Sequence, residues 1–79
     1  MPHFFFHTRD GEPLTDEVGS ECRNLDDAQR AAVALASSMV RDNPDLVLEH
    51  QQFTVDVVDA SGSVVFQVAI TALSRGTLQ

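Results

Sequence analysis

Two histidines near the start of the chain, His3 and His7, are the first residues whose type suggests chemistry, since histidine is the commonest metal ligand in proteins. Residues 3–8 are rich in aromatic side chains and lie between a proline and an Asp-Gly turn signal, which predicts a β-strand. Because a strand rises ~3.3 Å per residue, the two histidines stand roughly 13 Å apart. One metal ion therefore cannot join them within a subunit.

Cys22 is the only cysteine, so the chain can form no internal disulfide and is expected in a reducing, cytoplasmic compartment. A reactive thiol needs a base within hydrogen-bond reach, whereas the acidic neighbours Glu17 and Glu21 oppose the charge of a thiolate. We therefore interpret Cys22 as a structural residue.

Four acids near the first turn, Asp10, Glu12, Asp16 and Glu17, suggest a calcium site, but the EF-hand spacing with its central glycine and final glutamate is missing. The sequence also lacks a Gly-rich phosphate loop, a Cys-x-x-Cys pair, a His-Glu-x-x-His helix and a nucleophile elbow. We therefore expect a protein that is not an enzyme and that binds no cofactor or metal.

Twelve acids against five arginines and no lysine give the 79 residues a formal net charge of −7. Such a field repels phosphate groups, which argues against direct nucleic-acid binding and against anionic membrane surfaces, and it favours a basic protein partner. No apolar run approaches the ~20 residues of a membrane span. The length predicts one domain, residues 1–70, followed by a tail, residues 71–79.

The stretch from Gln52 to Ile70 predicts a β-hairpin, because apolar and polar residues alternate on both sides of a four-residue turn, Asp59-Ala60-Ser61-Gly62. Asp59 is expected to bond to the following backbone, and Gly62 to take the positive φ that closes the turn.

Residues 25–41 predict an amphipathic helix, in which Leu25, Ala28, Ala32, Leu35, Ala36 and Met39 form one apolar stripe. Asn24 is the expected N-cap, and Pro44 should end the helix near Asp42. Leu46 and Leu48 are expected to pack under the sheet edge.

An acidic, turn-rich segment, residues 10–24, precedes this helix. We expect an ordered loop pinned by Leu14, Val18 and Cys22. A short extra strand returning through Leu14 would place Pro13 on an outer edge.

These elements predict an α+β domain of order β-α-β-β, with one helix on one face of a three-stranded, mainly antiparallel sheet. The first two strands can lie side by side in parallel, or the last strand can lie between them; we favour the second arrangement, because antiparallel sheets tolerate a wet face. The expected core from the strands comprises Phe4, Phe6, Phe53, Val55, Val57, Val64, Phe66, Val68 and Ile70.

The uncovered face of this sheet is the expected interaction surface, because it combines apolar residues with a polar rim. Homodimerisation through this face, or through an open edge strand, is the simplest use of it. The residues expected there are His3, Phe5, His7, Asp56, Val58, Val65 and Gln67.

The opening Phe5-Phe6-His7-Thr8-Arg9-Asp10-Gly11 resembles the aromatic-aromatic-His-x-Arg-Asp-Gly start of a small bacterial family known only as a domain of unknown function. Residues 16–21 are similar to its Asp-Glu-x-Gly-x-Glu loop, and the helix and the Asp-x-x-Gly-x-Val-Val hairpin follow in the same order. The resemblance implies no activity and no catalytic residues. We expect the two signature segments to form a structural loop, fixed by an ion pair from Arg9 to Asp16, Glu17 or Glu21, and comprising Arg9, Asp10, Gly11, Asp16, Glu17, Gly19 and Glu21.

The leading interpretation is a cytoplasmic, non-enzymatic domain that acts through protein contacts and forms a homodimer. The alternative is an antitoxin-like regulatory domain that binds a basic protein, a reading that rests on layout alone.

Overall fold

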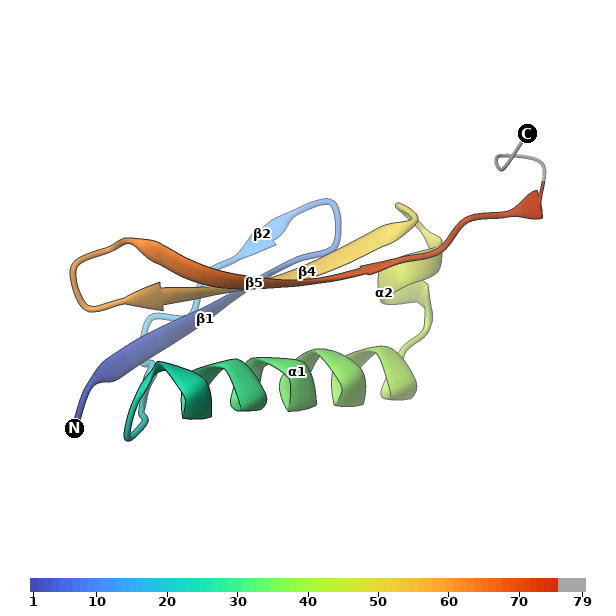
Figure 1. Ribbon diagram of the computed structural model, residues 1–79. Helices are drawn as coiled ribbons and strands as arrows, with labels where there is room; N and C mark the ends of the chain where they lie inside the picture. The colour runs from blue at the N-terminus through green and yellow to red at the C-terminus, as the bar shows by residue number, and fades with distance from the viewer. Residues whose placement is uncertain (76–79) are drawn as a thin grey trace.

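The computed structural model describes residues 1–75 and consists of one long helix packed along one face of an antiparallel sheet (Figure 1). The elements follow in the order β1 (His3–Arg9), β2 (Pro13–Leu14), β3 (Ser20–Glu21), α1 (Leu25–Asp42), α2 (Asp45–Leu48), β4 (Gln52–Asp59) and β5 (Val64–Thr71). The expected α+β class is confirmed, and the possible short strand through Leu14 is present as β2, at the edge of the sheet. A second short strand, β3, and a short helix, α2, enlarge the predicted β-α-β-β order.

The sheet has the order β2-β1-β4-β5, with β3 also paired to β1, and all its pairs are antiparallel. Both predicted arrangements of the three long strands are therefore wrong, because β1 lies antiparallel beside β4 and β5 is an edge. The reason is the segment between β1 and α1. It pairs first with the end of β1, through β2, and then with its beginning, through β3, so α1 starts beside the start of β1 and β4 begins at its far end.

The long helix begins and ends where the sequence predicts. The Asn24 side chain accepts a hydrogen bond from the Asp27 N–H at 2.9 Å. Three alanines of the stripe, Ala28, Ala32 and Ala36, are fully buried, and such small side chains let the helix lie close to the sheet. In α2 it is Val47 that is buried, while Leu48 is 61% exposed, so the expectation that Leu48 packs inside is wrong.

The strand core contains Phe4, Phe53, Val55 and Val57, all buried, and the predicted members Phe6, Phe66, Val68 and Ile70 are partly buried against it. Val64 is 60% exposed, contrary to prediction. A register shift explains the difference: Val57 faces Phe66 while its neighbour Val58 faces Val64, which leaves Val65 as the extra residue of a β-bulge. Val65 packs against the core cluster and does not belong to the open face.

The turn between β4 and β5 has the predicted chemistry. The Asp59 carboxylate accepts hydrogen bonds from the N–H groups of Ser61 and Ser63, and Gly62 has a φ of +91°. The chain stays attached just beyond β5, where the Ala72 N–H donates to the Gln51 carbonyl at 3.0 Å. Most of the expected tail is described, but residues 76–79 lie outside the described residues. No helix within residues 1–75 is long and apolar enough to span a membrane.

Candidate functional site

The open face of the sheet is formed by the residues of β1, β4 and β5 that point away from α1. Cross-strand pairing arranges them in three rows that run across the strands. These rows are Phe5–Val58–Val64, His7–Asp56–Gln67 and Arg9–Thr54–Ala69.

The apolar row is largely covered by its own side chains. The Phe5 ring lies between two imidazoles, with ring centroids 5.1 Å from His3 in an edge-on arrangement and 6.4 Å from His7 in a stacked one. Val58, the cross-strand partner of Phe5, is only 7% exposed. Exposed apolar area on this face is therefore smaller than the sequence suggests, and Val64 contributes most of it.

The polar row is held by hydrogen bonds. The Gln67 amide donates to the Asp56 carboxylate at 2.6 Å, across β4 and β5. The His7 Nδ1 atom accepts from the backbone N–H of Asp16 at 3.0 Å, so this nitrogen carries no proton in the bonded form. The first histidine is fixed by the same loop, because the His3 Nε2–H donates to the Val18 carbonyl at 2.8 Å.

Asp16 holds the acidic loop against the edge of β1. One carboxylate oxygen accepts from the Phe6 N–H at 3.1 Å, and the other accepts from the N–H groups of Val18 and Gly19 at 3.1 and 2.9 Å. The hydrogen bond from Gly19 is the largest cause that lowers the pKa of Asp16 below its ordinary value; partial burial opposes it, and the hydrogen bonds from Phe6 and Val18 lower the pKa further. Asp16 thereby caps the strand edge between β2 and β3, where no backbone partner reaches.

The residues of the predicted structural loop lie at two ends of β1, and the predicted ion pair does not hold them. Within residues 1–75, Arg9 forms no ion pair, whether with Asp10, Glu17, Glu21 or any other acid. Gly19 has a φ of +72°, and a Cβ placed there would lie 2.5 Å from the His3 ring and 2.8 Å from the Phe4 carbonyl oxygen. Gly11, with a φ of +107°, packs in the same way on the His50 ring.

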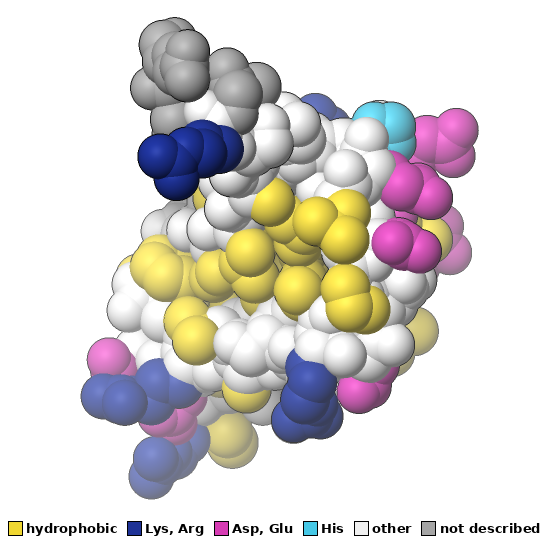
Figure 2. Space-filling view, turned by 90° about the vertical axis from the view of Figure 1, so that its right-hand side faces the viewer, with side chains coloured by type: hydrophobic (Ala, Val, Ile, Leu, Met, Phe, Trp, Pro, Cys, Tyr) yellow, Lys and Arg dark blue, Asp and Glu magenta, His cyan; other side chains and the backbone are white. Residues whose placement is uncertain are grey.

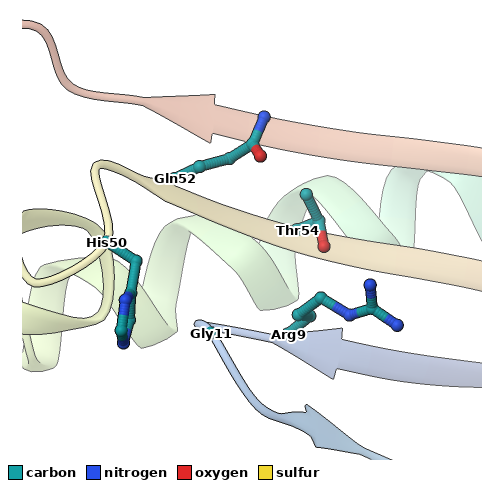
Figure 3. A pocket seen from close by; sticks show the side chains of 5 residues that line it. All are labelled: Arg9, Gly11, His50, Gln52 and Thr54. Atoms are coloured by element: carbon teal, nitrogen blue, oxygen red, sulfur yellow. The ribbon is translucent and has the colours of Figure 1, made fainter.

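A small hollow of about 150 Å³ lies where the open face meets the Gly11 turn, and Arg9, Gly11, His50, Gln52 and Thr54 line it (Figure 3). Sequence reasoning found no partner for His50. The sequence contains both Gly11 and His50, but their contact can be inferred only once β1 is known to lie beside β4.

A second, wider hollow of about 470 Å³ adjoins the first and shares Gly11 and His50 with it. Its other lining residues are acids: Asp10, Glu12 and Glu49. Figure 2 shows acidic side chains beside a histidine along one margin of this end of the molecule, while hydrophobic side chains fill the middle. Among residues 1–75, no three His, Cys, Asp or Glu side chains come together as a metal site.

One long helix on an antiparallel sheet, with a carboxylate-fixed loop along the first strand, defines a small two-layer α+β domain. The chain belongs to the family described as a domain of unknown function, DUF6894, whose model matches residues 3–71. The match runs from the first residue of β1 to the last residue of β5, so the family unit is this fold. Searches of the curated proteins and of the solved structures found no match.

Proposed function

We propose that the domain works by binding protein, and in the first place a second copy of itself, along the free edge of β5. The observation that carries this proposal is the edge itself. Within residues 1–75, β5 pairs only with β4; the strand is eight residues long and contains no charged residue and no proline. Proteins block pairing at an exposed edge with charges, prolines or β-bulges; β5 has no charge and no proline, and its one bulge, at Val65, lies near the start of the strand and leaves the rest regular.

The side of the molecule next to this edge is also incompletely covered. Phe66, Val68 and Ile70 point toward α1 but stay partly exposed, and Val33 on the helix is 48% exposed. A hollow of about 570 Å³ lies between the two elements, lined by Asp26, Gln29, Arg30, Val33, Ala34 and Phe66. A second copy would complete the core on this side.

Two-fold symmetry makes such a contact self-complementary. Antiparallel pairing of two β5 strands places both copies of α1 on the same face, running in opposite directions. Asp26, near the start of one helix, then approaches Arg41, near the end of the other, so opposite charges meet although each chain carries a net charge of −7. Backbone hydrogen bonds between the edge strands supply the affinity.

Molar mass in solution, measured by light scattering over a concentration series, tests the proposal. We expect a dimer that Val33→Asp converts to folded monomer, since a charge at Val33 would be buried between the helices. Phe5→Asp is the matched control on the open face and should leave the dimer intact. Dissociation by Phe5→Asp alone would move the interface to the open face, and a monomer at every concentration would refute self-association.

A basic protein is the second candidate partner, favoured by the net charge and by the acids Asp10, Glu12 and Glu49 that gather around one hollow. This alternative predicts salt-sensitive binding that survives Val33→Asp and is lost when these three acids are replaced by their amides.

A further inference from the structure

The hollow of about 150 Å³ beside Arg9 has the properties of a ligand site that protein binding along β5 does not use. Arg9 and Thr54 are cross-strand partners in β1 and β4, so their side chains stand next to each other on the open face. Figure 3 shows Arg9 and Thr54 on neighbouring strands, with Gln52 farther along β4 and with Gly11 and His50 at the end opposite the guanidinium.

Every side chain that lines the hollow offers hydrogen-bond donors that nothing else in residues 1–75 engages. Arg9 takes part in no ion pair and no side-chain hydrogen bond there, in contrast to Arg23, Arg30 and Arg41, each of which pairs with an acid. The Thr54 hydroxyl and the Gln52 amide are equally unengaged within the described chain. A guanidinium beside a hydroxyl and an amide favours an anion, and its planar pair of N–H groups matches a carboxylate.

The surroundings decide which anion fits. Asp10, Glu12 and Glu49 line the adjoining hollow, on the other side of Gly11 and His50. This negative field penalises a doubly charged phosphate more than a singly charged carboxylate, because Coulomb repulsion scales with charge. The volume of about 150 Å³ suits a small group.

We propose that this hollow binds the carboxylate of a small, singly charged organic acid. Arg9 forms the charge-assisted hydrogen bonds, Thr54 and Gln52 donate to the same group, and the His50 ring closes the end of the site. Gly11 has a φ of +107°, and a Cβ there would lie 2.4 Å from the Nε2 atom of the imidazole in its present position.

Titration of the ¹⁵N-labelled intact chain with sodium acetate, followed by amide chemical shifts, tests the assignment. We expect saturable shifts centred on Gly11, Gln52 and Thr54. Arg9→Gln should weaken acetate binding by about tenfold or more, since a charge-assisted hydrogen bond is lost. Thr54→Val should weaken it less. Arg75→Gln, which removes another arginine, is the matched control and should leave binding unchanged.

Sodium phosphate and sodium chloride at equal ionic strength show whether the site selects a carboxylate. Shifts of equal size and affinity with phosphate or chloride would overturn the proposal, as would acetate shifts that persist in Arg9→Gln. N-acetyl-triglycine separates a small free acid from the end of a peptide chain. Tighter binding of this peptide than of acetate would overturn the assignment to a small acid.

Discussion

A single carboxylate, that of Asp16, organises the loop on which both signature segments of the chain depend. It accepts hydrogen bonds from three backbone N–H groups, while the backbone of the same residue donates to His7. Two of these contacts reach β1, and the others shape the turn that leads to β3. The loop is therefore fixed to the sheet by backbone recognition rather than by an ion pair.

Asp16→Asn replaces one accepting oxygen by an amide that cannot accept, at almost constant size. We expect it to lower the free energy of unfolding by about 1–2 kcal/mol, because backbone N–H groups lose their charged acceptor. Chemical denaturation measures the difference. Glu17→Gln is the control, since the neighbouring side chain is exposed and makes no such bonds, and an equal loss in both variants would contradict the role of Asp16.

The free energy of unfolding should fall in acid, because the folded state lowers the pKa of two carboxyl groups, those of Asp16 and Asp59. The folded state lowers the pKa of Asp16, chiefly through the Gly19 N–H, and that of Asp59, chiefly through the Ser61 hydroxyl, from an ordinary value of 3.8. Both groups therefore stabilise the fold fully above pH 3.8, and this contribution is lost as the pH falls through the lowered values.

Thermal unfolding of the wild type and of Asp16→Asn between neutral pH and pH 2 checks this sign. The two curves should converge toward the acid end, since a protonated Asp16 no longer differs in charge from asparagine. A constant gap over the whole range would contradict the assignment.

At the scale of elements, three glycines with positive φ set the turns, and their surroundings differ. A Cβ at Gly62 would meet nothing within 4 Å, whereas one at Gly11 would meet only the ring of His50, an exposed side chain that can rotate. A Cβ at Gly19 would meet the Phe4 carbonyl and the ring of His3, which is held by its bond to Val18.

Alanine substitutions at these three glycines should therefore lower the free energy of unfolding by different amounts. Gly62→Ala is expected to cost about 1–2 kcal/mol from backbone strain alone. Gly11→Ala should cost a similar amount, and Gly19→Ala clearly more, because the loop must move away from β1. Denaturation midpoints measure the order, and Gly19→Ala should stay the worst in a His3→Ala background, where the carbonyl contact persists. Equal costs at all three positions would contradict this account.

Local patterns predicted the elements well and their arrangement poorly. The Asn24 cap, the end of α1 and the Asp59 turn follow from residues a few positions apart, and each is confirmed. The strand order was not predictable, because it depends on pairing between strands far apart in the sequence, which no local periodicity encodes. The β-bulge likewise could not be read from alternation, and it places Val64 on the open face and Val65 against the core, the reverse of the prediction.

The candidate site shows the same limit. The residues of the open face were predictable from alternation along β1, β4 and β5, apart from Val65 at the bulge of β5. The Arg9 hollow was not, because it joins a strand end, a turn and the entry to β4 that come together only when β1 and β4 are neighbours. Sequence alone also gave no ground for choosing β5 as the free edge.

At the scale of the whole molecule, the proposed pairing of β5 strands requires opposite charges to meet between antiparallel helices. Arg41→Asp should weaken the dimer by placing two acids together, and adding Asp26→Arg should restore it. Sedimentation at several salt concentrations measures both effects, which salt should reduce. If the double variant does not recover the wild-type dimer, the two-fold arrangement is contradicted. Light scattering would then show whether the chain self-associates in another way.

The pairing of β1 with β4 also affects folding, because the two strands are far apart in the sequence. β1 leaves the ribosome before β4, the strand that pairs along its full length, and β4 follows only after the loop and both helices. Until then its three consecutive phenylalanines have no sheet to join. Such distant pairing slows folding relative to helical domains of equal size, and it exposes an aggregation-prone segment during synthesis. In the folded domain, residues 13–21 cover the other edge of β1 through β2, β3 and the Asp16 carboxylate.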